Sequence, residues 1–293
     1  MKFHLAILIP LLILSRSVYC DIGDKNRADT IGWGVYSDQP PVFIIEGIDK
    51  GNGIADNIYV ELQRHLPEFQ HHQVQAKLLR IIAMISAKEK ICAVMFKTPE
   101  RESMMRFSSV AVGWLSSPRL AVASDRLDEF HAQTGWQNGE ISLREMIEEH
   151  PNLRLGLNTG SSYGNTLDDK LKGIGRHNRI YRHSGFNSTR ALLHMLLAGR
   201  VDYILEHSWV IKFVLKGDLN KVTLIPLTGA PDYVEVFVGC PRNSWGQSVI
   251  RRIDPLIAEV RNRSAARIEN WLPEYEISNY RKSFQAKFGG EHY

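Results

Sequence analysis

Hydrophobic residues along the first part of the chain alternate between strand-like runs and helical spacings. Ile58 and Leu62 recur at helical spacing, and Pro67 ends that pattern. This order of strand, helix and strand predicts a largely parallel sheet, with ligand-binding groups at the ends of its strands. The strands are expected at 30–35, 73–79 and 91–96, and the helices at 54–66 and 80–90.

A second alternating unit begins near residue 120. A further strand at 234–240 and helices over 248–272 then close the chain. The periodicity fits two consecutive domains as well as one domain inserted into another. In the second unit, strands are expected at 120–123, 153–157 and 201–205, and helices at 141–149, 165–172, 189–198 and 208–215. The segment 222–227 then leads back through a link at 228–232 that contains glycine and proline.

The N-terminus has the pattern of a secretory signal peptide. Lys2 precedes an apolar stretch over 3–14, and Cys20 occupies the last position before a cleavage site. The apolar stretch is too short to cross a bilayer, which favours cleavage over an uncleaved anchor. Tyr19 is bulky where a lipid-modified cysteine needs a small neighbour. We therefore expect residues 1–20 to be removed and the protein to be exported.

Composition and charge exclude several classes of function. The formal net charge of +4 falls to +2 when Lys2 and Arg16 leave with the signal peptide, which is too mild to indicate binding of nucleic acid or of an anionic membrane. His71 and His72 are adjacent on an expected strand and point to opposite faces, which argues against a metal site. The chain lacks a Walker loop, a zinc-ligand spacing and a Ser-His-Asp elbow. We expect no metal, no cofactor and a monomer.

Arg101 is the leading candidate for a ligand-binding residue, together with Thr98 in the same turn. The stretch T-P-E-R over 98–101 follows the apolar run 91–96 and is followed by F-S at 107–108. A guanidinium just past a buried strand is well placed to clamp a carboxylate with its planar set of donors. The alternative is a surface arginine paired with a neighbouring glutamate, since such weak ion pairs are common.

A second candidate anion site lies where an expected strand passes into a helix, at Gly160-Ser161-Ser162. Free backbone N–H groups and the positive end of a helix dipole favour an anion there. The alternative is an ordinary serine cap, and both can hold because the hydroxyl can cap the helix while the amides face a cleft. Arg101 and this turn would then hold one carboxylate from both sides.

Several short motifs, taken in order, give the chain a family resemblance. Their order and spacing cover nearly the whole mature chain, which resembles bacterial extracellular solute-binding proteins of the polar amino-acid type. The resemblance implies an α/β, two-lobe fold of the periplasmic-binding-protein type II class, in which a two-stranded hinge joins two mixed sheets flanked by helices. The motifs are T-P-E-R-x5-F-S over 98–108, Gly53-Ile54-Ala55-Asp56, Gly160-Ser161-Ser162, Gly199-Arg200-Val201-Asp202 and Ile268-Glu269-Asn270-Trp271-Leu272.

The resemblance also implies how the chain divides into lobes. Residues 21–115 and 230–293 would form the first lobe, and residues 116–229 the second. The chain would leave the first lobe near 113–118 and return near 228–233. Closure of the two lobes about these crossings would enclose the ligand.

The resemblance assigns roles to residues of the cleft, with two departures from the family pattern. Arg101 would hold the α-carboxylate of an amino acid, and an acid five residues after Asp202 would hold its ammonium. That position is His207, and the adjacent Glu206 can serve only if the backbone turns it inward. Phe96 stands where the family commonly has a hydroxyl residue. Both departures leave open a larger or modified ligand, or a peptide fragment.

Two residues near the end of the first strand complete the candidate site. Tyr36 is a candidate to stack on an apolar part of the ligand. Trp33 and Phe43 lie nearby, and for both of them a place in the core or at the rim is the stronger expectation. Glu46 lies in the same loop region and is a candidate for contact with a ligand cation.

Cys92 and Cys240 are the two cysteines that remain after signal cleavage. An oxidising compartment permits a disulfide between them, and two separate buried thiols are the alternative. The resemblance places both strand-like runs in the same lobe, which favours the disulfide.

The resemblance predicts a periplasmic solute-binding protein that captures a small carboxylate-bearing ligand for an inner-membrane ABC permease. Two alternatives keep the same fold. One is an enzyme similar to cyclohexadienyl dehydratases, in which Glu206 or His207 would supply a general acid or base. The other is a sensory ligand-binding module without a transporter.

Overall fold

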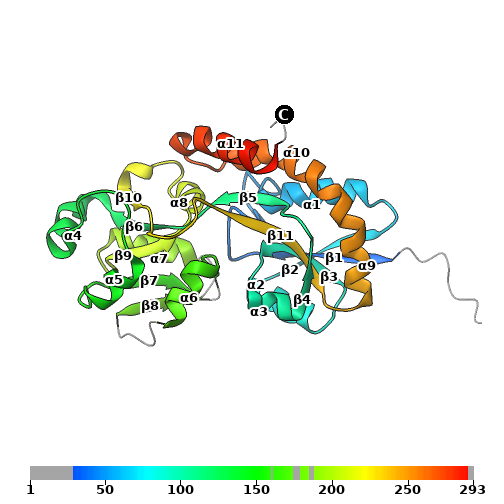
Figure 1. The fold of residues 1–293 in the computed structure, drawn as a ribbon, viewed down its shortest axis with the longest axis horizontal. Coiled ribbons are helices and arrows are strands. Elements are labelled where there is room, and N and C mark those ends of the chain that lie inside the picture. Colours follow the sequence, from blue (N-terminus) through cyan, green and yellow to red (C-terminus); the bar gives the residue numbers. More distant parts are fainter. Residues whose placement is uncertain (1–28, 160, 174–178, 185–187, 290–293) are drawn as a thin grey trace, which may run out of the picture.

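Two β-sheets with their covering helices make up the described chain (Figure 1). The computed structural model describes residues 29–159, 161–173, 179–184 and 188–289. The expected signal peptide at 1–20 and Gly160 of the serine motif lie outside these ranges. Within them, no helix is long and apolar enough to cross a membrane. The expected fold class of two mixed sheets flanked by helices is confirmed.

The first sheet combines parallel strands from the beginning of the chain with one long strand from its end. Its strands are β1 (Thr30–Tyr36), β2 (Gln70–Ala76), β3 (Ile91–Phe96), β4 (Met105–Phe107), β5 (Gly113–Ser116) and β11 (Tyr233–Pro241). The order is β2-β1-β3-β11-β4, with β5 also paired to β11. β1 is parallel to β2 and β3, because a helix lies in each connection between them. β11 is antiparallel to all three of its partners.

The second sheet has the order β10-β6-β9-β7-β8. Its strands are β6 (Arg119–Ala123), β7 (Leu155–Asn158), β8 (Ile180–His183), β9 (Tyr203–Glu206) and β10 (Val222–Ile225). β7 is parallel to both β8 and β9, so the carboxyl ends of these three strands meet at one edge of the sheet. β6 joins antiparallel to β9 and β10.

Helices cover the faces of both sheets. α1 buries the side chains of Ile58 and Leu62, as their spacing predicts, and packs against α10. The helices are α1 (Ile54–His65), α2 (Leu78–Ser86), α3 (Pro99–Met104), α4 (Leu127–Thr134), α5 (Leu143–Glu148), α6 (Asn165–Gly173), α7 (Ser188–Leu197), α8 (Ser208–Val214), α9 (Ser244–Ile253), α10 (Ile257–Glu269) and α11 (Glu274–Phe288).

The chain passes twice between the two sheets. It leaves the first sheet between β5 and β6 and returns between β10 and β11, and Figure 1 shows β5 and β11 in the middle, between the two groups of elements. The second sheet is therefore built from one continuous stretch of chain inserted into the first. The lobe boundaries at 115/116 and 229/230, and any hinge motion about them, stay predictions.

The sequence pattern misplaces an edge strand and omits the last helix. The pattern predicts a strand at 73–79 and a helix from residue 80, whereas β2 and α2 both begin earlier. β2 lies at the sheet edge and most of its side chains are at least partly exposed, so it lacks the apolar run of an inner strand. The pattern also predicts closing helices only to residue 272, whereas α11 follows and buries Tyr280 and Phe284.

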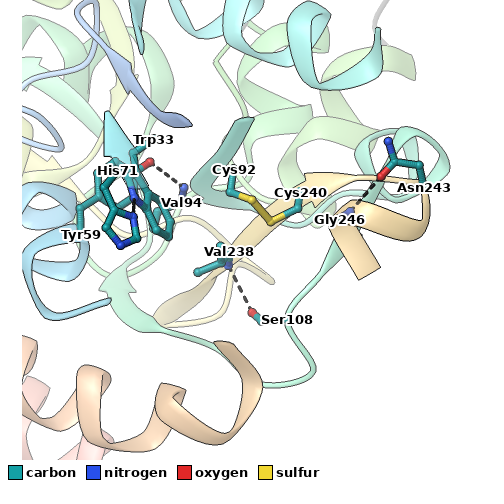
Figure 2. The surroundings of a disulfide bond; sticks show 10 residues. All are labelled: Trp33, Tyr59, His71, Cys92, Val94, Ser108, Val238, Cys240, Asn243 and Gly246. Carbon is teal, nitrogen blue, oxygen red and sulfur yellow. Dashed lines mark hydrogen bonds between the residues drawn. A yellow bond between two sulfur atoms is a disulfide. The ribbon is translucent and has the colours of Figure 1, made fainter. Parts of the chain in front are cut away.

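A disulfide links Cys92 of β3 to Cys240 of β11 (Figure 2). The register pairs Ala93 with Gly239, so one further step places the two cysteines opposite each other. Their Cα atoms are 4.3 Å apart, close to the roughly 4.5 Å of a non-hydrogen-bonded antiparallel pair. The chain thus contains the expected disulfide rather than two separate thiols. The bond ties the returning strand to the N-terminal part of the sheet.

Removing the disulfide in the variant Cys92→Ala/Cys240→Ala should lower the free energy of unfolding. The bond spans 148 residues, and restricting so long a loop in the unfolded chain contributes about 3–5 kcal/mol. Urea denaturation of the mature protein measures the loss, with the reduced wild-type protein as a control that keeps both side chains. Titration of the unfolded, unreduced protein should find no free thiol. Two reactive thiols, or unchanged denaturation midpoints, would contradict the bond.

Candidate ligand-binding site

A mostly apolar cavity lies at the carboxyl ends of the parallel strands of both sheets. Tyr36 ends β1, Phe96 ends β3, Asn158 ends β7 and Glu206 ends β9, and all four residues line this cavity. In α/β folds this is the edge at which ligands bind. The space open to the centre of a water molecule is about 50 Å³, which is room for only a few waters.

The start of α1 fixes one wall of the cavity. Asp56 accepts hydrogen bonds from the N–H groups of Gly53 and Ile44, both at 3.0 Å. A Cβ atom at Gly53 would lie only 2.7 Å from the carbonyl oxygen of Val42, so this close approach requires glycine. Val42 and Ile54 line the cavity. The G-I-A-D motif therefore holds the loop after β1 in place beside the site.

Arg101 reaches back from α3 toward the end of β3. Thr98 caps α3 by accepting a hydrogen bond from the Arg101 N–H at 3.2 Å, and Pro99 is its first residue. The guanidinium Nη1 donates to the carbonyl oxygen of Phe96 at 2.8 Å. Arg101 is only 7% exposed, and burial lowers its pKa. No carboxylate of the described chain forms an ion pair with it, although Asp168 and Glu100 lie near enough to favour its charged form. Arg101 is thus buried, and not the surface arginine of the alternative.

The turn after β7 already holds a carboxylate of its own chain. Asp168 accepts hydrogen bonds from Ser162 Oγ at 2.6 Å and from the Tyr163 N–H at 2.8 Å. Because α6 begins only at Asn165, Ser162 does not cap it in the way the sequence suggests. Asp168 therefore places a carboxylate beside the turn that the sequence argument offers to a ligand anion. Ser161 and Ser162 both line the cavity.

Glu206 turns inward at the end of β9 and is 6% exposed. Its carboxyl accepts hydrogen bonds from Thr189 Oγ1 and Asn158 Nδ2, both at 3.1 Å, and from the His207 N–H at 3.0 Å. Burial raises the pKa of Glu206 to about 7, because these three hydrogen bonds only partly offset the loss of water. No cationic side chain pairs with it in the described chain. The cavity thus contains a buried acid as well as a buried cation.

His207 packs into a stack of rings between the two sheets. Its ring lies 5.8 Å from the ring of Phe96 and 4.7 Å from that of Trp209, in stacked geometry. Its Nδ1 is 2.8 Å from the carbonyl oxygen of Ser116. Burial lowers the pKa of His207 to about 4, so the ring is neutral near pH 7. Phe96 and His207, the two departures from the family pattern, therefore contact each other across the site.

The structure places the remaining predicted residues differently. Tyr36 lines the cavity, but its hydroxyl already donates to the Val94 carbonyl oxygen at 2.7 Å, so only its ring faces a ligand. Thr98 lines a wider cavity on the other side of Arg101. Glu46 is exposed and lines a separate cavity. The structure therefore brings Tyr36 into the site and leaves Glu46 outside it.

Gln39 is a site residue that the sequence analysis does not single out. Its Nε2 donates to Ser161 Oγ at 3.1 Å. Gln39 follows β1 of the first sheet and Ser161 follows β7 of the second, so this hydrogen bond joins opposite walls of the cavity. Asn158 and Thr189 are also assigned no role from the sequence. The position of Asn158 at the end of a parallel strand is the signal that could have indicated it.

Solved structures of similar fold include binding proteins and sensor domains. A histidine kinase sensor domain with similarity to periplasmic binding proteins covers 85% of this chain and 98% of its own, with a TM-score of 0.63 and 12% identity. A putative L-cystine ABC transporter protein from Listeria monocytogenes covers 84% and 97%, with a TM-score of 0.60 and 17% identity. A periplasmic binding protein of Salmonella typhimurium with high arginine specificity covers 84% and 100%, with a TM-score of 0.59 and 14% identity.

This chain has the type II periplasmic-binding-protein fold. Other structures with this fold include substrate-binding proteins of amino-acid ABC transporters. No protein-family model and no curated protein sequence matches the chain. Because the identities are low, the likeness shows the fold alone. The chemistry of this cavity must therefore be argued from its own side chains.

Substituting Glu206→Gln should change how the stability of the ligand-free protein depends on pH. Since burial raises the pKa of Glu206 from 4.5 to about 7, the folded protein binds this proton more tightly than the unfolded chain. The contribution of this proton to the free energy of unfolding is fully present below about pH 4.5 and is lost as the pH rises to about 7. The loss amounts to about 3 kcal/mol. The His207 pKa, lowered to about 4, acts in the opposite direction in both proteins.

Urea denaturation of the wild type and of Glu206→Gln near pH 4.5 and near pH 7.5 measures this effect. The free energy of unfolding of the variant, relative to the wild type, should rise by about 3 kcal/mol between these two pH values. If the free energies of unfolding of the variant and the wild type differ by the same amount at both pH values, the substitution has altered only hydrogen bonds. That result would contradict a buried carboxyl that is protonated in the folded protein.

Proposed function

We propose that this protein binds a small zwitterionic amino-acid ligand in the cavity between its sheets. Arg101 holds the carboxylate of the ligand, and Glu206 holds its ammonium. One observation carries the proposal: a buried guanidinium and a buried carboxyl line the same cavity, and neither forms an ion pair with a charged side chain of the described residues. A zwitterion supplies both missing partners at once.

The energetics of burial explain why this site favours a zwitterion. An ion in a protein interior costs several kcal/mol unless it is paired. The guanidinium of Arg101 cannot lose its proton to escape that cost. Glu206 escapes it in the ligand-free protein by binding a proton, as its pKa of about 7 indicates. An ammonium beside Glu206 favours the ionised carboxyl, so both charges are compensated when the ligand is bound.

The solved structures of similar fold support amino acids as the ligand class. They favour two functions for ligand binding, which are delivery to a transporter and signalling. Similar structures include substrate-binding proteins of amino-acid ABC transporters, which favours export to the periplasm and delivery to an inner-membrane permease. A histidine kinase sensor domain shares the fold, and this favours a sensory module as the second candidate. Permease genes beside the gene for this chain would support delivery, and a kinase gene there would support signalling.

A dehydratase-like enzyme remains the alternative in which the ligand is changed. The pKa of about 7 at Glu206 favours it, because a general acid or base works best near the ambient pH. Incubating the identified ligand with the protein and recording its NMR spectrum separates the two proposals. An unchanged ligand supports binding alone, whereas a new product supports the enzyme.

Replacing Arg101 with alanine or lysine should nearly abolish ligand binding while the fold survives. Losing a charge-assisted contact in a closed cavity costs about 2–5 kcal/mol. The ligand is first identified by native mass spectrometry of gently purified protein, and calorimetry then measures its affinity for each variant. Arg106→Ala is a matched control, since Arg106 is exposed and does not line the cavity. If Arg101→Ala binds the ligand with an affinity within about threefold of wild type, Arg101 does not hold the ligand's carboxylate.

Ligand binding should also make the protein more compact. Arg101 belongs to the first part of the chain and Glu206 to the inserted part, so one ligand contacts both only when the two parts are together. The walls of the cavity lie close together in this structure, and the space open to the centre of a water molecule is only about 50 Å³. The ligand-free protein must therefore also populate a more open form that admits the ligand. Solution X-ray scattering should therefore give a smaller radius of gyration at saturating ligand.

The variant Gln39→Ala tests the same motion without ligand. It removes the hydrogen bond from Gln39 to Ser161 that joins the two walls, so the ligand-free variant should have a larger radius of gyration than the ligand-free wild type. An unchanged radius in the wild type, with binding verified in the same sample, would show that the cleft does not close on its ligand.

A further inference from the structure

Two buried polar atoms that line the cavity have no hydrogen-bond partner. They are the indole Nε1 of Trp209 and the amide Oδ1 of Asn158, in residues that are 3% and 6% exposed. Other unpartnered side-chain atoms occur in the described chain, but none of them belongs to a residue that lines this cavity. A buried polar group without a partner is costly. These two therefore have the properties of ligand contacts.

Both atoms are held in fixed positions by their surroundings. The indole of Trp209 stacks on the ring of His207 at 4.7 Å with an interplanar angle of 30°. The amide nitrogen of Asn158 donates to Thr189 Oγ1 at 2.8 Å and to Glu206 Oε2 at 3.1 Å. These two acceptors determine which end of the amide is the nitrogen, and they leave Oδ1 as a free acceptor. The residues that line the cavity thus include one fixed neutral donor and one fixed neutral acceptor without partners.

The charges of the lining exclude a charged ligand side chain. Glu206 is the only acid among the cavity-lining residues of the described chain, and Arg101 is the only cation. The ammonium and the α-carboxylate of an amino acid use both of them. His207 is neutral near pH 7, because burial lowers its pKa to about 4. A charged side chain that stays within this cavity would therefore lack a counter-ion among its described lining residues, which is strongly unfavourable.

We propose that this site selects an amino acid with a short, neutral side chain that carries a hydrogen-bond acceptor. The Nε1–H of Trp209 donates to that acceptor, and Oδ1 of Asn158 accepts a hydrogen bond from the ligand's ammonium. The proposal rests on the proposed function and adds the ligand class. It distinguishes this chain from the Salmonella typhimurium protein of the same fold, which has high arginine specificity.

Pairs of ligands with nearly the same shape test the role of Trp209. Threonine and valine form one such pair, and glutamine and methionine form another. In the wild type, the member with the acceptor should bind about tenfold more tightly in at least one pair, because a site built for a hydrogen bond rejects the analogue that lacks it. Arginine, lysine and glutamate should bind more weakly than threonine or glutamine. Calorimetry measures all of these affinities.

The variant Trp209→Phe should remove the preference within each pair while both members still bind. Trp136→Phe is the matched control, since Trp136 Nε1 also lacks a partner but lies outside the cavity lining; this variant should keep the preference. In proton–nitrogen NMR spectra of the wild type, the Trp209 indole signal, assigned by its loss in Trp209→Phe, should shift with threonine or glutamine more than with the apolar member. A purely structural role of Trp209 would not produce that difference, and this readout does not depend on the stability of the variant.

The outcomes separate this inference from the proposed function. If no amino acid binds, the proposed function itself is wrong. If arginine or lysine binds best, amino-acid binding stands and the neutral ligand class is overturned. If Trp209→Phe lowers the affinity for every amino acid by the same factor, the indole contacts the α-carboxylate that all of them carry. Its role in selecting the ligand's side chain is then overturned. A lost preference together with a ligand-dependent indole shift supports the inference.

Discussion

The constraint on which the rest of this structure depends is the cost of holding charge away from water. Arg101 and Glu206 are both almost fully buried in one apolar cavity, and neither forms an ion pair with a described residue. Arg101 keeps its charge, and its guanidinium donates a hydrogen bond to the Phe96 carbonyl oxygen. Glu206 accepts three hydrogen bonds, and burial still raises its pKa to about 7. Such a pair is stabilised most by a molecule that brings a carboxylate and an ammonium together.

The fold holds these two charges in position by tying together segments that are distant in the sequence. Cys92 and Cys240 join the returning strand to the N-terminal part of the first sheet. The Asp56 carboxylate holds the loop after β1, and the cap at Thr98 holds α3 at the end of β3. The two chain crossings then set the inserted sheet with its strand ends beside the same cavity as those of the first. A hydrogen bond from Gln39 to Ser161 joins opposite walls of the cavity.

The departures from the family pattern belong to one arrangement. Phe96 and His207 stack on each other, and His207 stacks in turn on Trp209, so three rings fill the space where the resemblance implies a hydroxyl and an acid. The buried Glu206 lies one position earlier. Asp168 accepts hydrogen bonds from Ser162 Oγ and the Tyr163 N–H in the turn after β7, so this turn already holds a carboxylate. Arg101 is the one cation among the described residues that line the cavity.

Hydrophobic periodicity and turn chemistry act over a few residues, so the sequence by itself indicated alternating strands and helices. The two-lobe fold class came from the resemblance that the short motifs carry, since the periodicity fitted two consecutive domains equally well. The same local signals indicated Arg101 as a ligand-binding candidate. The sequence did not determine which way the side chains at the strand ends face or which residues they contact. Asn158 and Glu206 are 48 residues apart, and Gln39 and Ser161 are 122 apart, so their contacts exist only once the register and the chain crossings are formed. Only the tertiary structure turned Glu206 inward and left Glu46 outside, because burial at a strand end depends on the elements that pack over it.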